Sequence, residues 1–332
     1  MNVLSLFNGM SFCSMALESL GVNVDKMYSS EIDKYANQAT QALFPDTIQL
    51  GDVTDWREWD IDWASIDLVT GGFPCQAWSM AGKQLGDKDE RGMLFWTMLD
   101  IMKHVKYRNT GANFLIENVK MKKEFEQYIT THTENALGHV HKILINSALV
   151  SAQNRNRYYW TSFEVEQPID KGLVLADIIE RDVDSKYYLS EKLLNGFWAK
   201  KERRKEMNSG FDNLNVCEID KKSNCLTARY FKTSMSDPYI LQRPRGNNSG
   251  GVRAENSKTP TVSSCSWEHN NFAVLAGEIR KLTPRECFRL QTVTEHHIDT
   301  LLSAGISNTQ LYKMCGNGWT MLVIKHILKG LI

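Results

Sequence analysis

Short apolar runs alternate with helical periodicity through the first half of this 332-residue chain, from residue 1 to about residue 165. Short apolar runs bounded by turn residues are typical of buried strands, whereas apolar residues spaced three and four apart indicate helices. Their regular alternation predicts an α/β fold in which helices flank a parallel sheet. The predicted strands are VLSLF (3–7), MYSS (27–30), IDLVTGG (66–72), NFLIENV (113–119), KILINSALV (142–150) and RYYWTSF (157–163), and the predicted helices cover 13–20, 35–44 and 93–105.

Polar and small residues come directly after several of these predicted strands. The carboxyl ends of parallel strands meet at one edge of a sheet, and ligands of α/β proteins bind there. We therefore expect a functional site at that edge. The residues placed there are Asn8, Gly9, Glu31, Pro74, Cys75, Glu117 and Asn118.

The second half of the chain has a different residue pattern. From about residue 187 it consists of short β-prone pieces separated by Gly, Asn and Ser, as in RPRGNNSGG (243–251). The last segment, 311–331, again has helical apolar periodicity and could return to the first domain. We predict a first domain of residues 1–186 and 313–332, and a smaller, mostly β domain of residues 187–312.

Composition excludes several classes of protein. No apolar run approaches the roughly 18 residues of a membrane helix, and no secretory signal is visible, so we expect a cytoplasmic protein that does not bind membranes. The seven cysteines are scattered and form no C-x-x-C pair, which argues against a disulfide framework and a metal site. Residues 187–312 hold 18 Lys and Arg against 13 Asp and Glu, an excess of +5 within a chain of net charge zero. This local excess is what a DNA-facing surface needs.

The sharpest local motif is GGFPCQAWS (71–79), which places Cys75 after a proline on a glycine-flanked loop. Proline restricts the backbone and glycine permits close approach, so this loop could hold a thiolate rigidly against a substrate. A loop cysteine on its own is usually inert. The interpretation of Cys75 as a nucleophile depends on the motifs that accompany it.

Those motifs resemble, in order, the blocks of the DNA cytosine-5 methyltransferase family over almost the whole chain. The resemblance implies a Rossmann-like, S-adenosylmethionine-dependent methyltransferase domain with a smaller target-recognition domain at 187–312. It also implies methyl transfer from S-adenosylmethionine to carbon 5 of a cytosine in double-stranded DNA. The blocks are LFNGMSF (6–12), SSEID (29–33), GDV (51–53), GGFPCQAWSMAGKQ (71–84), DERGMLF (89–95), ENV (117–119), QNRNRYYW (153–160), RKLTPRECFRLQ (280–291) and GNGWTMLVIKHIL (316–328).

The chemistry explains why the catalytic blocks need these residue types. Carbon 5 of cytosine is a poor nucleophile, so a thiolate must first add at carbon 6, and Cys75 is the candidate. Glu117 is expected to protonate or hydrogen-bond N3, and Arg157 to hold O2 and pair with Glu117, with Arg155 nearby. By resemblance, Asn118 keeps the catalytic loop ordered.

The cofactor site is expected to use carboxylates at the ends of strands. Glu31 would accept hydrogen bonds from the ribose hydroxyls and Asp52 from the adenine amino group, with Ile32 and Val53 on either side of the ring. The resemblance implies that the remaining pocket residues are Phe7, Gly9, Met10, Pro74, Leu94, Asn317 and Trp319. Two places depart from the family pattern: Ser5 and Phe12 stand where an acidic residue and a glycine are usual, and GNGW replaces GNS or GNA.

A cytosine inside a duplex is out of reach, so the reaction requires base flipping. The loop after Cys75 is expected to close over the flipped base, and the target-recognition domain to read the sequence in the major groove. The expected DNA contacts are Ser79, Lys83, Gln84, Arg91, Arg229, Lys232, Arg243, Arg245, Arg253 and Trp267.

The sequence has two alternative interpretations. A tRNA cytosine-5 methyltransferase on the same scaffold typically has a short variable region with a Cys-Phe-Thr signature, which is not found in this sequence. A DNA-binding relative without activity is disfavoured by the presence of Cys75, Glu117 and Arg157. We expect a compact, monomeric bacterial or phage modification enzyme, with a cognate restriction endonuclease as a possible partner.

Overall fold

The computed structural model describes residues 1–74, 92–190, 192–193, 195–197, 216–217, 220–228, 230–232, 239–241 and 279–332. Their main feature is a sheet of seven strands in the order β3-β2-β1-β4-β5-β7-β6. Six strands coincide with predicted runs, and β3 was not predicted. The strands are β1 (Asn2–Leu6), β2 (Lys26–Ser30), β3 (Ile48–Gln49), β4 (Ile66–Gly71), β5 (Asn113–Val119), β6 (His141–Asn146) and β7 (Asn156–Thr161).

The α/β fold is confirmed, but the sheet is mixed and departs at one edge from the parallel sheet that the sequence predicts. Strands β1 to β5 pair in parallel, but β7 is antiparallel to both β5 and β6. The physical reason is the short connection 147–155 between β6 and β7, because a parallel crossover needs about a dozen residues or more. The run KILINSALV also ends as a strand at Asn146, and Ser147–Leu149 forms a 3-10 turn.

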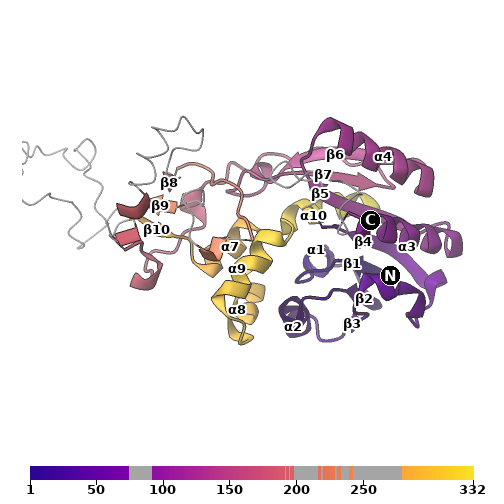
Figure 1. Ribbon diagram of the computed structural model, residues 1–332, viewed down its shortest axis with the longest axis horizontal. Coiled ribbons are helices and arrows are strands. Elements are labelled where there is room, and N and C mark those ends of the chain that lie inside the picture. The colour runs from indigo at the N-terminus through magenta and orange to yellow at the C-terminus, as the bar shows by residue number, and fades with distance from the viewer. Residues whose placement is uncertain are drawn as a thin grey trace, which may run out of the picture.

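Helices cover both faces of this sheet (Figure 1). One core contains α1, α2 and α10, and the other contains α3 and α4. Neighbouring residues of β5 show the division: Leu115 lies in the first core, and Phe114 and Ile116 lie in the second. The helices are α1 (Phe12–Ser19), α2 (Lys34–Leu43), α3 (Leu94–Arg108), α4 (Lys123–Leu137), α7 (Pro284–Leu290), α8 (Glu295–Ser303), α9 (Asn308–Asn317) and α10 (Met321–Leu328).

Three short strands form a second sheet, in the order β10-β9-β8. They are β8 (Val216–Cys217), β9 (Tyr239–Leu241) and β10 (Ile279–Lys281). Figure 1 shows this sheet apart from the large one, with α7, α8 and α9 between them. Residues 284–312, within the predicted range 187–312, are mainly helical, since they contain α7, α8 and the first part of α9. A capping box at Thr283, followed by Pro284, starts α7. The domain boundaries themselves stay a prediction.

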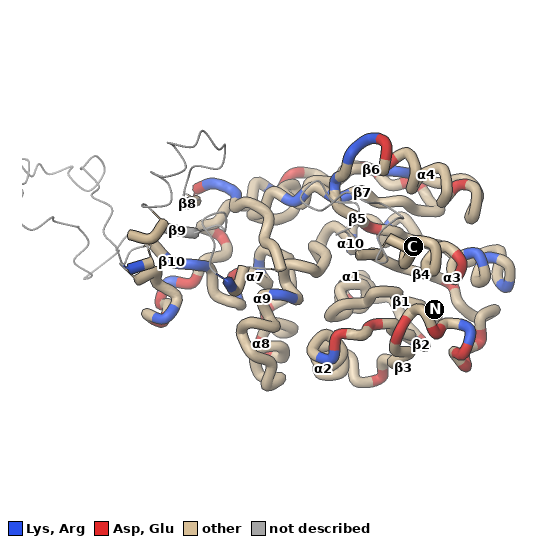
Figure 2. The backbone as a smooth tube through the Cα atoms, in the orientation of Figure 1, with Lys and Arg blue, Asp and Glu red and all other residues tan. Residues whose placement is uncertain are grey.

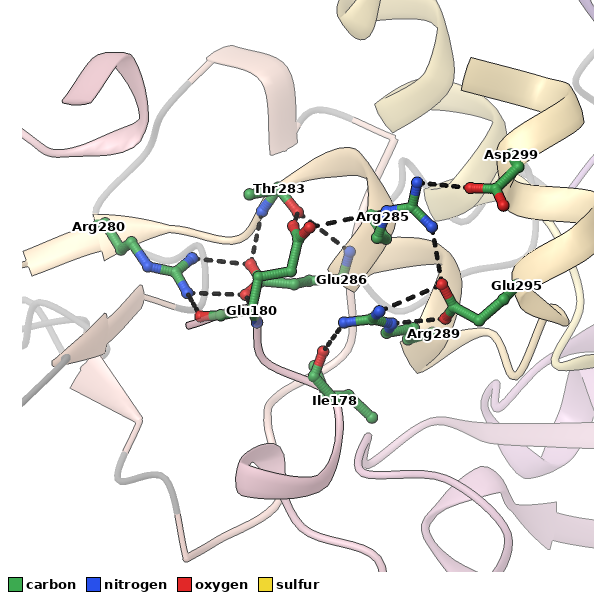
Figure 3. A network of polar contacts seen from close by, with 9 residues as sticks. All are labelled: Ile178, Glu180, Arg280, Thr283, Arg285, Glu286, Arg289, Glu295 and Asp299. Atoms are coloured by element: carbon green, nitrogen blue, oxygen red, sulfur yellow. Dashed lines mark hydrogen bonds and ion pairs between the residues drawn. The ribbon is translucent and has the colours of Figure 1, made fainter. Parts of the chain in front are cut away.

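A buried ion pair fixes β10 to α7 (Figure 3). The Arg280 guanidinium donates to both Glu286 carboxylate oxygens at 2.7 Å, and both side chains are 0% exposed. Glu286 also accepts from the backbone N–H groups of Glu180 and Thr283. The network therefore joins the segment that leaves the large sheet to the start of α7. In the described parts of the chain, no helix is long and apolar enough to cross a membrane.

Candidate active site

The turn after β1 has an unusual backbone. Phe7 (φ 52°) and Ser11 (φ 67°) adopt left-handed conformations that are uncommon for residues other than glycine, and Gly9 does so as well (φ 59°). The Gly9 N–H donates to Glu31 Oε2 at 2.9 Å, which ties this turn to the end of β2. Strained backbone of this kind gathers at ligand sites. The turn lies where the sequence predicted the cofactor.

The two predicted cofactor carboxylates follow neighbouring strands. The second oxygen of Glu31 accepts from the backbone N–H groups of Ile32 and Asp33, at 2.8 and 2.9 Å. Asp52 accepts from the backbone N–H and the hydroxyl of Thr54, both at 2.9 Å, and begins a 3-10 turn. Local backbone bonds therefore hold both carboxylates at the sheet edge.

The side chains beside these carboxylates differ in exposure. Ile32 is 74% exposed, whereas Val53 is 5% exposed and packs in the core with α3 and α4. An exposed isoleucine next to an anchored carboxylate fits a surface that a planar ring would cover.

The other residues predicted to line the cofactor pocket lie at element ends. Phe7 and Leu94 are partly buried, and Leu94 is the first residue of α3. Met10 is 0% exposed and its side chain packs in the core beside α1. Asn317 is exposed at the end of α9.

Glu117 and Arg157 lie side by side on antiparallel strands. Glu117 is near the end of β5, and the pairing of Val119 with Arg157 brings the arginine from β7 alongside. Arg157 Nε lies 3.0 Å from Glu117 Oε1, and the side chains are 14% and 11% exposed. A charge pair so poorly exposed interacts more strongly than one in water, and it lies at the predicted edge of the sheet.

Asn118 connects this pair to the predicted nucleophile loop. Its Nδ2 donates to the carbonyl oxygen of Phe73 at 3.0 Å, and its Oδ1 accepts from the N–H of Val119. Asn118 is 1% exposed, so these bonds are shielded from water. Pro74 is the last described residue before this loop, and Cys75 lies outside the described residues.

Trp319 contacts Glu117, which the sequence did not predict. The Trp319 indole N–H donates to Glu117 Oε2 at 3.0 Å. The two oxygens of Glu117 are thus bound by different donors, Arg157 on one and Trp319 on the other. No signal in the sequence relates these residues, which are 202 positions apart.

Arg155 is buried, and its hydrogen bonds go to groups other than Glu117. It is 2% exposed, and its guanidinium donates to the carbonyl oxygens of Gly316 and Gly318 and to the sulfur of Cys225, the last at 3.3 Å. Burial opposes ionisation of the Cys225 thiol, but the charges of Arg155 and Arg157 outweigh it and lower its pKa. Cys225, in the segment KKSNCLTAR (221–229), was not predicted from the sequence.

Ser5 and Phe12, the two residues that depart from the family pattern near the first block, each contact identified residues. Ser5 is buried on β1 and accepts a hydrogen bond from the Thr70 hydroxyl at 3.2 Å. Phe12 begins α1 and is 2% exposed. A Cβ atom at Gly318 would lie 2.1 Å from the Phe12 ring, so the two unusual positions, 12 and 318, are in contact.

Most of the predicted DNA contacts lie outside the described residues. These are Ser79, Lys83, Gln84, Arg91, Arg229, Arg243, Arg245, Arg253 and Trp267. Lys232 is described and exposed, with its ammonium 5.7 Å from the centre of the Phe231 ring. A group of basic residues that was not predicted follows β5 directly: Lys120, Lys122 and Lys123 are exposed, and Figure 2 shows basic residues where α4 begins.

Among the described residues, no group of His, Cys, Asp and Glu side chains could hold a metal ion. The candidate site contains a carboxylate, a guanidinium and an indole close to Gly72, just after β4.

Comparison with known proteins finds a family model and relatives that match most or all of this chain. A family model described as C-5 cytosine-specific DNA methylase matches residues 1–332. The type II methyltransferase M1.ScrFI of Lactococcus lactis subsp. cremoris is 32% identical over 326 residues, which cover 93% of this chain and 72% of the relative. The orphan methyltransferase M.SPRI of Bacillus phage SPR is 27% identical over 434 aligned positions, covering 100% of this chain and 97% of the phage protein.

A solved structure has a similar fold. The crystal structure of a mutant of DNMT2 from Spodoptera frugiperda superposes with a TM-score of 0.67 and covers 99% of both chains at 22% sequence identity. At that identity the likeness concerns the fold alone.

Proposed function

The chain belongs to the C-5 cytosine-specific DNA methylase family and is a DNA cytosine-5 methyltransferase, and from this premise we propose how its own residues carry out the reaction. The methyl group passes from S-adenosylmethionine to carbon 5 of a flipped cytosine in a specific double-stranded DNA sequence. Cys75 is the covalent nucleophile. The observation that carries the proposal is the Glu117–Arg157 pair, near the end of β5 and the start of β7.

Each residue acts on a different atom of the base. The Cys75 thiolate forms a bond to carbon 6, and Glu117 gives a proton to N3, so that carbon 5 becomes an enamine carbon. Arg157 donates to O2 and stabilises the charge that develops there. After methyl transfer, a base removes the proton from carbon 5, the carbon–sulfur bond breaks to release the Cys75 thiolate, and N3 returns its proton to Glu117.

The described residues fit S-adenosylmethionine as the cofactor, which supplies an electrophilic methyl group on its sulfonium sulfur. The Glu31 and Asp52 carboxylates are held at the sheet edge, and the exposed Ile32 offers an apolar surface for a ring. We propose that the turn containing Phe7 and Gly9 holds the methionine part. Arg155 positions the wall of the cofactor pocket at Gly316 and Gly318, because its guanidinium donates hydrogen bonds to the carbonyl oxygens of both residues.

Base flipping and sequence recognition are part of the same proposal. A base in the stack cannot reach Glu117, so it must rotate out of the duplex, at a cost of a few kcal/mol. Residues 187–279 read the sequence, and Lys120, Lys122 and Lys123 contact phosphates close to the site. Replacing 187–279 by the matching stretch of a relative should change the methylated sequence and leave the modified atom unchanged.

The direct test uses the wild-type enzyme and Cys75→Ser. Bisulfite sequencing of DNA from expressing cells should show one methylated cytosine context for the wild type and none for Cys75→Ser. Wild type should also form a stable covalent complex with DNA that contains 5-fluorocytosine. Robust methylation by Cys75→Ser would overturn the covalent mechanism.

The alternative substrate is tRNA, proposed from the sequence. The same preparation should therefore be assayed on tRNA in parallel. Since the curated relatives are named as type II or orphan methyltransferases, DNA is the substrate we expect to be modified. Because one relative is named as a type II methyltransferase, we also propose a cognate restriction endonuclease as a partner.

A further inference from the structure

Glu117 is held from two sides in the structure. Arg157 Nε lies 3.0 Å from Oε1, and the Trp319 indole N–H donates to Oε2 at 3.0 Å. With one donor, a carboxyl group can still rotate about its terminal torsion, which has a broad energy profile. With a donor on each oxygen, the plane of the carboxyl group is defined.

The position of Trp319 depends on the glycine before it. Gly318 ends α9, and its N–H donates to the Met314 carbonyl oxygen at 2.8 Å, while its own carbonyl oxygen accepts from Arg155 at 2.7 Å. A Cβ atom at 318 would lie 2.1 Å from the Phe12 ring. The turn between α9 and α10 is thus packed against α1 and bound by Arg155, the residue before β7, and its indole N–H reaches Glu117 on β5.

The end of β4 packs against the same hydrogen bond. A Cβ atom at Gly72 would lie 3.0 Å from both Glu117 Oε2 and Trp319 Nε1. Gly72 follows β4 directly and is three positions before Cys75, so the segment that leads to the proposed nucleophile leaves no room for a side chain beside this donor and acceptor. A larger residue at 72 would separate these groups.

We propose that Trp319 is a positioning residue for addition to the base, through its indole N–H on Glu117. The inference rests on the proposed function of Glu117. Trp319 holds the carboxyl group in the orientation that addresses N3. Because Asn317 on the same turn was predicted to line the cofactor pocket, the turn connects that pocket to the base-binding carboxyl group.

A different role for Trp319 is that of an apolar cofactor wall without any effect on Glu117. The two roles predict different rates for a reaction that needs no cofactor. When Cys75 adds to carbon 6 and Glu117 protonates N3, carbon 5 can exchange its hydrogen with solvent, and reversal restores cytosine. Exchange of deuterium into carbon 5 therefore reports base addition alone.

The experiment compares wild type, Trp319→Phe and Trp63→Phe. Phenylalanine keeps an aromatic ring but removes the donor, and Trp63 is a matched control in the aromatic cluster with Trp56 and Trp59. Without cofactor, Trp319→Phe should exchange deuterium roughly 10- to 100-fold more slowly than wild type, the scale of one hydrogen bond to a charged group. Trp63→Phe should match wild type.

Binding of S-adenosylmethionine, measured by calorimetry, and the melting temperature separate the outcomes. We expect Trp319→Phe to bind the cofactor within about threefold of wild type and to remain folded, the loss being one hydrogen bond. Trp319→His, which retains a ring N–H, should recover part of the exchange rate. Normal exchange by Trp319→Phe with weakened cofactor binding would overturn the positioning role. No exchange by wild type would instead reject the proposed function.

Discussion

Arg280 and Glu286 form a doubly hydrogen-bonded ion pair that no solvent reaches, at the junction of β10 and α7. Removal of one partner leaves a buried charge whose desolvation is no longer compensated. The pair therefore controls stability more than any exposed ion pair in the network of Figure 3 does.

We predict that Glu286→Gln destabilises the protein by about 3–5 kcal/mol, whereas Arg285→Gln, at a partly exposed position, costs less than about 1 kcal/mol. Urea unfolding of both variants measures the difference. The double variant Arg280→Met/Glu286→Leu should recover only part of the loss, because it buries no charge but removes the acceptor of the Glu180 and Thr283 backbone N–H groups. Equal stability of Glu286→Gln and wild type would contradict the role given to this pair.

Glu117 and Arg157 are expected to act as one unit. Glu117→Gln and Arg157→Ala should each lower the single-turnover methylation rate by about 10²–10³-fold or more, the scale of one donor to a developing charge. The double variant should be little slower than the poorer single variant, because each loss disables the other residue. Rates that multiply in the double variant would show that the two residues act independently.

Cys225 should react with iodoacetamide at lower pH than an ordinary thiol. Its pKa is lowered because the charges of Arg155 and Arg157 outweigh the effect of burial, so the thiolate is present at a pH where a free cysteine is still protonated. Cys225 in the urea-unfolded protein is the control, since unfolding removes both the burial and the nearby arginine charges. Mass spectrometry of the labelled peptides across pH gives both profiles, and equal midpoints would refute the prediction.

Gly318→Ala tests the contact between positions 12 and 318. Gly318 has φ −70° and ψ 170°, which alanine can adopt, so any cost comes from collision with the Phe12 ring. We predict a loss of about 1–3 kcal/mol, as for other overpacked sites. In a Phe12→Ala background the loss should be smaller but not zero, because the Met314 carbonyl oxygen is also 2.9 Å from the added Cβ. Additive losses in a urea-unfolding cycle would rule out the contact as the cause.

The strands that carry the site could be predicted because their residues are locally distinctive. The apolar runs that precede Glu31 and Pro74 have the length and flanking turns of buried strands, and so does the run that contains Glu117. Helix α4 was missed because KEFEQYITTHTENAL (123–137) has few apolar residues, and only a few of its residues are buried. The direction of β7 was also missed, since it depends on the length of a connection rather than on composition.

The sequence by itself determined the family, the order of the motifs and the residue types available for catalysis, because these follow from local patterns along the chain. Only the tertiary structure decided the partners. Arg155 binds Gly318, 163 positions away, and Trp319 binds Glu117, 202 positions away. Such contacts depend on how helices α9 and α10 pack against the sheet, and close packing between distant segments leaves no periodic signal in the sequence.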